Sequence, residues 1–315
     1  MNKLWAITAY FNPVGYRLRL ENYRRFRRHL SVPLAAAEIS YTGDFALRES
    51  DADRVLRFRS DDVIWQKERL LNLLIDALPQ TCDAVAWIDC DVLFESDGWA
   101  SHAMTALDRY ELIHLYDHRV NLPRNENLEE IPRADATAES PAPTPSAIYL
   151  MHQGKATDDD FRNADVPVGF RSTVGLAWAS SRKVLEDHGL YDVCVVGGAD
   201  RAILGAALGR YDIGIQALNM QGPREDHYRA WAKGFFEAVE GRVGYIPGRV
   251  FHLWHGDLLD RQYASRLKIL NDHSFDPFSD ISLDPQGIWR WDSHKPQLHR
   301  EIRAYFESRK EDGRV

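Results

Sequence analysis

Two aspartates separated by a single residue follow an apolar run in the first third of the chain. The run covers residues 84–94 (AVAWIDCDVLF) and places Asp89 and Asp91 where a buried strand is expected to end. Side chains alternate along a strand, so both carboxylates should point to one side and Cys90 to the other. Buried charge is costly unless it is paired or binds a metal. These two aspartates therefore form either a divalent-cation site or two solvated capping residues.

A third acidic residue stands at the start of an apolar helix expected over residues 201–208. Gly197 and Gly198 lead through Ala199 to Asp200. An aspartate there is either a helix cap or a general base that accepts a proton from an attacking hydroxyl. The two glycines favour the base, because they let a substrate approach the backbone closely.

Two histidines lie in the segment 251–256 (FHLWHG). Imidazole is a common transition-metal ligand, and it is also a common hydrogen-bonded core group. We expect an extended segment, in which His252 and His255 would face opposite sides and only His255 would be a ligand.

Alternating strands and helices should position these residues. The apolar patterns predict strands over residues 5–11, 34–41, 54–58, 84–94, 111–116 and 173–179, an extended segment over 245–254, and helices over 20–30, 63–78, 181–188, 224–240, 258–271 and 297–310. Asp61 or Asp62 is the expected N-cap of the second helix. This order predicts an α/β fold with a mostly parallel central sheet flanked by helices, in which ligands bind beyond the carboxyl ends of the strands.

A proline-rich segment interrupts this pattern. Residues 121–147 contain five prolines among small and acidic residues. Such a composition does not build a core, so the segment is expected to be a flexible insertion or an active-site lid.

Composition excludes several classes of protein. The 315 residues carry a net charge of −8, which disfavours nucleic acid as a partner. We find no run of the roughly 20 apolar residues that a membrane span needs and no signal-peptide pattern at Met1. The three cysteines are widely spaced, as is typical of a reducing compartment, so we expect a soluble cytoplasmic protein.

Taken in order, these motifs resemble those of the GT-A-fold, nucleotide-sugar-dependent glycosyltransferases, and family 2-like members in particular. Residues 89–91 resemble the DxD motif, residues 197–200 the GGxD motif, and residues 251–256 the late histidine segment. The resemblance spans roughly residues 5–270 at superfamily level. The chain departs from the family at the first strand, which lacks the usual acidic pattern, and at Ala199, where glutamate is frequent.

The resemblance implies a GT-A (Rossmann-like) fold and a metal-dependent transfer of a hexose-type sugar from a UDP- or GDP-sugar to a hydroxyl acceptor such as a glycan. Asp89, Asp91 and His255 would hold Mn²⁺ or Mg²⁺, and Asp200 would be the base of an inverting reaction. Residues 1–120 would bind the nucleotide sugar, residues 148–275 would bind the acceptor, and residues 276–315 would be a C-terminal extension.

The same resemblance implies a set of donor-binding residues: Thr8, Tyr10, Asn12, Arg17, Gln66, Lys67, Asp89, Gly197, Gly198 and Arg261. Several have plain alternatives. Lys67 and Arg261 could be solvated surface charges, and Trp178 could be a core residue or a platform for a sugar ring.

Two other functions remain open from the sequence. A sugar-phosphate nucleotidyltransferase also uses carboxylate-bound Mg²⁺, although the turn at residues 12–15 is a poor version of the Gly-rich loop it needs. A non-catalytic nucleotide or carbohydrate binder would use Asp200 only as a cap.

Overall fold

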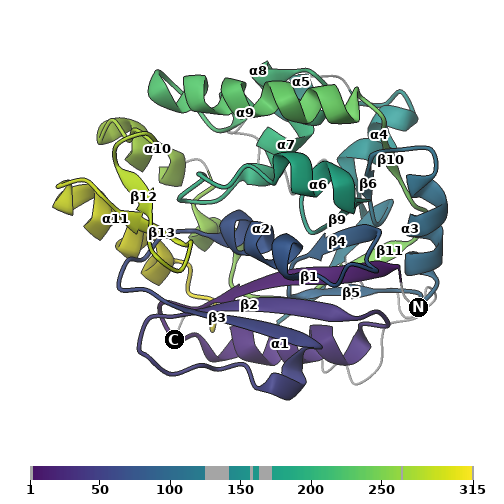
Figure 1. Cartoon of the computed structure of the whole chain (residues 1–315), viewed down its shortest axis with the longest axis horizontal. Helices are drawn as coiled ribbons and strands as arrows, with labels where there is room; N and C mark the ends of the chain where they lie inside the picture. The colour runs from purple at the N-terminus through teal and green to yellow at the C-terminus, as the bar shows by residue number, and fades with distance from the viewer. Residues whose placement is uncertain (1–2, 125–141, 157–158, 163–171, 264, 314–315) are drawn as a thin grey trace.

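A seven-stranded sheet forms the centre of the molecule (Figure 1). The computed structural model describes residues 3–124, 142–156, 159–162, 172–263 and 265–313. In spatial order the strands are β10 (Val243–Tyr245), β6 (Leu112–His114), β9 (Ala177–Ser181), β4 (Ala84–Ile88), β1 (Leu4–Phe11), β2 (Leu34–Ser40) and β3 (Arg54–Arg59). Strand β9 runs antiparallel to its neighbours β4 and β6, and the other pairs of this sheet are parallel. The expected α/β fold with a largely parallel central sheet is thus confirmed.

A second, four-stranded sheet carries the two segments with candidate metal ligands. Its order is β5 (Val92–Phe94), β11 (Arg249–His252), β7 (His118–Asn121) and β8 (Thr144–Pro145). Strand β11 runs antiparallel to β5 and parallel to β7. The run 84–94, expected as one strand, is therefore two strands in two sheets. A turn closed by the Val92 N–H and the Asp89 carbonyl, 3.2 Å apart, separates them.

Helices cover both faces of the central sheet (Figure 1). They are α1 (Arg17–His29), α2 (Lys67–Ala77), α3 (Trp99–Leu107), α4 (Ala147–His152), α5 (Asp159–Arg162), α6 (Arg182–His188), α7 (Ala199–Ala207), α8 (Tyr211–Ala217), α9 (Pro223–Val239), α10 (Ser265–Asp272) and α11 (Pro296–Ser308). Short 3₁₀ helices cover Glu49–Asp51 and Leu258–Arg261, and β12 (Ile281–Leu283) and β13 (Trp289–Trp291) form a hairpin.

The core lies on both sides of β1, as expected for a strand covered on two faces. Ile7 and Phe11 belong to the cluster that contains Leu70 of α2, and Ala6 belongs to the cluster that contains Tyr23 of α1. The period-two alternation of the strand thus divides its side chains between two helix layers.

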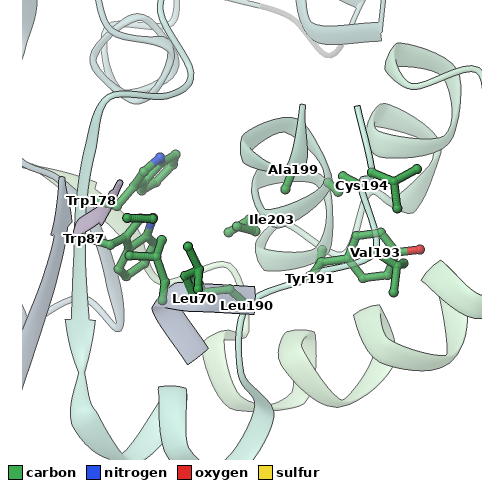
Figure 2. Packing of buried hydrophobic residues seen from close by; sticks show 14 of the residues in the cluster. Leu70, Trp87, Trp178, Leu190, Tyr191, Val193, Cys194, Ala199 and Ile203 are labelled. Carbon is green, nitrogen blue, oxygen red and sulfur yellow. The ribbon is translucent and has the colours of Figure 1, made fainter. Parts of the chain in front are cut away.

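Trp178 lies in the larger of these clusters (Figure 2). It is fully buried and stacks on its cross-strand partner Trp87, with ring centroids 6.4 Å apart. It cannot form a platform for a sugar, so the core alternative for Trp178 is confirmed.

Several expected boundaries are wrong. Helix α2 begins at Lys67 rather than at residue 63, and Asp62 accepts a hydrogen bond from the Trp291 N–H instead of capping it. The helix expected over 258–271 is broken after Arg261, because Gln262 has the left-handed φ of 48°. The strand expected from residue 173 begins at Ala177.

The proline-rich segment lies mostly outside the described residues, which omit 125–141. Its described ends belong to regular structure: Asn121 ends β7, Thr144 and Pro145 form β8, and Ser146 caps α4 through the Tyr149 N–H at 3.1 Å. Among the helices that the structure describes, none has both the length and the apolar character to cross a membrane.

Candidate functional site

Asp91, His252 and His255 converge at the junction of the two sheets. The His255 Nε2 lies 3.1 Å from the His252 Nε2 and 3.2 Å from the Asp91 Oδ2. Within the described part of the chain, these three residues are the group whose ligand atoms could hold a metal ion, with all of those atoms within 4.8 Å of one another. We call them the metal group.

Strand register explains this convergence. Residue His252 pairs with Val92, and the Leu253 N–H donates to the Asp91 carbonyl at 2.8 Å, so the end of β11 lies against the aspartate turn. The expectation that the histidines face opposite sides is wrong, because β11 ends at His252 and residues 253–255 do not continue the alternation of the strand.

The hydrogen bonds place a lone pair on the Nε2 of each histidine of this group, and that of His255 is at present taken up by Arg261. The His252 Nδ1 donates to the Asn121 Oδ1 at 3.1 Å, which leaves a lone pair on its Nε2. An Arg261 Nη2 donates to the His255 Nε2 at 2.8 Å, so that nitrogen also carries a lone pair. The Asp91 Oδ1 is buried and has no hydrogen-bond partner within the described ranges. Two lone pairs and a carboxylate that face one another favour a bound cation.

Burial sets the protonation of the metal group. It lowers the pKa of His255 to about 3 and that of His252 well below its usual range, and the positive charge of Arg261 acts in the same direction. Both imidazoles are therefore neutral, as ligands must be. Burial and the neighbouring Asp89 raise the pKa of Asp91 to about 7.

A second group surrounds Lys67 at the start of α2. Its Nζ lies 3.1 Å from the Asp89 Oδ1, 3.5 Å from the Asp200 Oδ2 and 3.5 Å from the Glu68 Oε1. Burial opposes its charge, but the three carboxylates together raise the pKa of Lys67 well above its usual value. Burial raises the pKa of Glu68 to about 7. The structure thus pairs Asp89 with a lysine and gives Lys67 partners, so Lys67 is no solvated surface charge.

Glycine makes room for the Asp200 carboxylate. A Cβ at Gly175 would lie 2.8 Å from the Asp200 Oδ2, so a side chain at that position would displace the carboxylate. Asp200 belongs to the first turn of α7, and the preceding Gly198 has a left-handed φ of 103°. Gly197 packs against Trp65, where a Cβ would come within 3.1 Å of the indole ring.

Three buried arginines, Arg261, Arg266 and Arg309, form an arginine group beside the metal group. The Tyr305 hydroxyl accepts from Arg266 at 2.6 Å and from Arg309 at 2.9 Å. Burial would raise the pKa of Tyr305, but these two guanidinium groups outweigh it and lower the pKa. The Nε atoms of Arg261 and Arg266 are buried without a hydrogen-bond partner in the described ranges. Such a group is suited to binding an anion.

The C-terminal tail reaches the same place. Glu311 is 1% exposed, and its carboxylate accepts from the Arg19 Nη1 at 2.8 Å and from the Arg309 Nε at 2.6 Å. Burial would raise the pKa of Glu311, but the two arginines hold it well below its usual range. The sequence predicts only a closing helix here, whereas the residues after that helix also form buried ion pairs beside the metal group.

Five of the expected donor-binding residues have partners within the fold, and their role in donor binding stays a prediction. The Thr8 hydroxyl donates to the Ile88 carbonyl at 2.7 Å, and the Tyr10 ring packs edge-on against Tyr23 in the core. Asn12 accepts a hydrogen bond from the Tyr16 N–H, and Arg17 forms an ion pair with Glu21 on the surface. The Gln66 side chain donates to the Trp289 carbonyl and accepts from the Trp289 N–H. A polar side chain near a strand end is often needed to complete the fold.

Comparison with known proteins gives a likeness in fold. No protein family model matches the chain, and no curated protein matches it. Among solved structures, it is similar to the mannosyltransferase PcManGT from Pyrobaculum calidifontis in complex with GDP-Man and Mn²⁺ (13% identity, TM-score 0.42, 96% of this chain and 69% of that chain). It is also similar to glucosyl-3-phosphoglycerate synthase from Mycobacterium tuberculosis in complex with Mn²⁺, UDP and phosphoglyceric acid (12% identity, TM-score 0.37, 90% and 82%). A third similar structure is 4-diphosphocytidyl-2C-methyl-D-erythritolsynthase from Anaerococcus prevotii (10% identity, TM-score 0.36, 78% and 86%).

Proposed function

We propose that this protein is a metal-dependent transferase of GT-A type that moves a sugar from a UDP- or GDP-sugar to a hydroxyl acceptor. The observation that carries the proposal is the contact between the metal group and the arginine group, made by Arg261 and His255 at 2.8 Å. A cation site beside buried guanidinium groups suits a diphosphate, which binds both.

The metal group would hold Mn²⁺ or Mg²⁺ through Asp91, His255 and His252, and the two imidazoles favour Mn²⁺. The ion would neutralise the charge that grows on the leaving diphosphate. Arg261 donates to the same Nε2 that would bind the ion, so with the ion bound its guanidinium group would be available to the diphosphate. Asp89, held by Lys67, would bind the ribose or contact the ion through water.

Asp200 would act as the general base for the acceptor hydroxyl. Lys67 lies 3.5 Å from its carboxylate and pairs with it, and Gly175 leaves room for the carboxylate, because a Cβ there would lie 2.8 Å from the Asp200 Oδ2. A base opposite the leaving group would give inversion at the sugar carbon. Residues 1–120 would bind the donor together with the arginine group, and residues 148–275 would bind the acceptor.

Release of nucleoside diphosphate tests this proposal. The protein is mixed with UDP- and GDP-sugars, Mn²⁺ and a panel of hydroxyl acceptors, and free UDP or GDP is measured with and without a chelator. We expect metal-dependent release that rises with an acceptor. Pyrophosphate formed from a nucleoside triphosphate and a sugar phosphate would instead identify a nucleotidyltransferase. Nucleotide binding without turnover on any donor would identify a binding protein.

A further inference from the structure

His255 has one ring nitrogen whose partner is still missing. Its Nε2 accepts a hydrogen bond from Arg261, which has only donors, so the proton of the neutral ring is on Nδ1. That Nδ1 is buried and makes no hydrogen bond to any residue that the structure describes. A buried N–H without an acceptor is costly, so an acceptor should be close.

Glu311 is the acceptor that the fold supplies. Its Oε1 lies 3.9 Å from the His255 Nδ1, which is an ion-pair distance rather than a hydrogen bond. Its carboxylate is fixed by Arg19 and Arg309 and is 1% exposed, so it cannot turn away to water.

The tail that carries Glu311 is anchored against the histidine turn. The backbone carbonyl of Arg309 packs so closely on Gly256 that a Cβ there would lie 2.7 Å from it. Asp312 accepts from the backbone N–H groups of Arg17 and Leu18 at 3.0 and 2.8 Å, at the start of α1. The position of Glu311 beside His255 is thus set by contacts on both sides of it.

The other histidine of the metal group shows what such a partner does. The His252 Nδ1 donates to the Asn121 Oδ1, which orients the ring and leaves its Nε2 free as a ligand. Metal-binding histidines commonly have a carboxylate or carbonyl partner of this kind, which fixes the tautomer and raises the basicity of the ligand nitrogen.

We propose that Glu311 is a positioning residue that accepts a hydrogen bond from the His255 Nδ1–H and so directs the His255 Nε2 to the metal ion. The inference rests on the metal site of the proposed function. A rotation of the His255 ring toward Glu311 would close the present 3.9 Å gap. The last residues of the chain thereby become part of the metal site.

Titration of the protein with Mn²⁺ alone tests this role. The electron paramagnetic resonance signal of the free ion gives the Mn²⁺ affinity at each step. Outer partners of metal ligands typically contribute about 10–100-fold to metal affinity, and we expect a loss in that range for Glu311→Gln. The matched control is Glu307→Gln, which makes the same change at an exposed position near the end of α11 and should retain wild-type affinity. Equal losses in the two variants would show that the loss does not depend on the contact with His255 and would overturn the proposal.

A double-mutant cycle separates positioning from structure. If Glu311 acts through His255, Glu311→Gln should have no further effect on Mn²⁺ affinity in a His255→Asn background and should keep its effect in a His252→Asn background. Additive losses in the His255→Asn background would contradict the proposal.

Nuclear magnetic resonance of the unaltered, metal-free protein gives a readout that needs no variant. The ring nitrogens of His255 should show the proton on Nδ1, and a proton on Nε2 would overturn the assignment. Failure of the two proposals can be told apart. No Mn²⁺ binding by the wild type would refute the metal site and the role of Glu311 together, whereas equal binding by wild type and Glu311→Gln would refute only Glu311.

Discussion

Two buried histidines in this molecule, His114 and His255, are alike in burial and charge but lie in different surroundings. His114 lies in the core between Trp178 and Tyr116, and its Nε2 donates to the Val174 carbonyl at 2.8 Å. Burial lowers its pKa to about 3, the same value that His255 reaches in the metal group. Within the described ranges, each of these two histidines also has an Nδ1 without a hydrogen-bond partner.

The difference lies in what surrounds each ring. Aromatic rings pack on His114, whereas Asp91, Arg261 and a second imidazole converge on His255. A buried neutral histidine is therefore no sign of a binding site by itself. Convergence of charged groups and lone pairs, which cost free energy unless a ligand completes them, is the distinguishing feature.

The largest expected effect is a loss of sugar transfer on substitution of Asp200, which pairs with Lys67 near the metal group. Asp200→Asn should reduce sugar transfer by about 10²–10⁴-fold, the range for a positioned base, and leave Mn²⁺ affinity unchanged. Steady-state rates measure the sugar transfer, and Mn²⁺ titration measures the affinity for the ion. Asp226→Asn, in the first turn of α9, is the matched control for a first-turn carboxylate and should retain full transfer. Full transfer by Asp200→Asn as well would mean that Asp200 only stabilises the helix.

A ligand substitution should separate metal binding from stability. His255→Asn is expected to weaken Mn²⁺ binding by at least the roughly 100-fold at the upper end of outer-partner losses, because it removes a ligand itself. The midpoint of metal-free thermal unfolding should change little, because the substitution removes one of the two Nε2 lone pairs that face each other at 3.1 Å in the metal-free protein. Unchanged Mn²⁺ affinity would remove the distinction between the two histidine environments.

The core histidine should show the opposite pattern. His114→Asn removes the stacking on Tyr116 and leaves the Val174 carbonyl unpaired, which should cost about 1–3 kcal/mol in the free energy of unfolding. Denaturant titration measures that loss, and Mn²⁺ affinity should not change. The exposed His102→Asn serves as the control and should stay within about 0.5 kcal/mol of wild type. A loss of Mn²⁺ affinity in His114→Asn would show that the two environments are coupled.

The smallest effect is the dependence of stability on pH. His114 is neutral in the folded protein down to about pH 3 but takes up a proton near its ordinary pKa of 6.5 when unfolded. The unfolded state therefore binds more protons below pH 6.5, and this histidine should lower stability by up to about 1.4 kcal/mol for each pH unit below that value. The difference between wild type and His114→Asn, followed by denaturant titration between pH 7 and 5, isolates its share. A constant difference across that range would contradict the burial argument.

The parts of the fold with strong local periodicity could be predicted from the sequence. Strands β1, β2 and β3 and helices α1 and α2 follow from alternating or helical apolar patterns, apart from the late start of α2. The aspartate pair was also recognised at a strand end, because charge after an apolar run is unusual. These signals lie within short stretches of the chain, so a single sequence is enough to predict these elements.

The rest of the site depends on contacts between distant parts of the chain. Glu311 meets Arg19 across 292 positions, and the sequence around either residue gives no sign of the other. The convergence of His252 and His255 does not follow from the sequence, because their relative direction depends on where β11 ends, and the strand ends at His252. The structural partners of Thr8 and Asn12 are also hidden from the sequence: the Thr8 hydroxyl bonds a carbonyl 80 positions away, and Asn12 accepts from the Tyr16 N–H.

The central claim is that Asp91, His252 and His255 hold the metal ion. A crystal structure with Mn²⁺ and UDP, with the ion located by its anomalous scattering, tests this claim most directly. The expected result is one strong peak in direct contact with the Asp91 carboxylate and both Nε2 atoms, with Arg261 moved from His255 to the diphosphate. A peak elsewhere, or an Arg261 that still donates to the His255 Nε2 while nucleotide is bound, would contradict it.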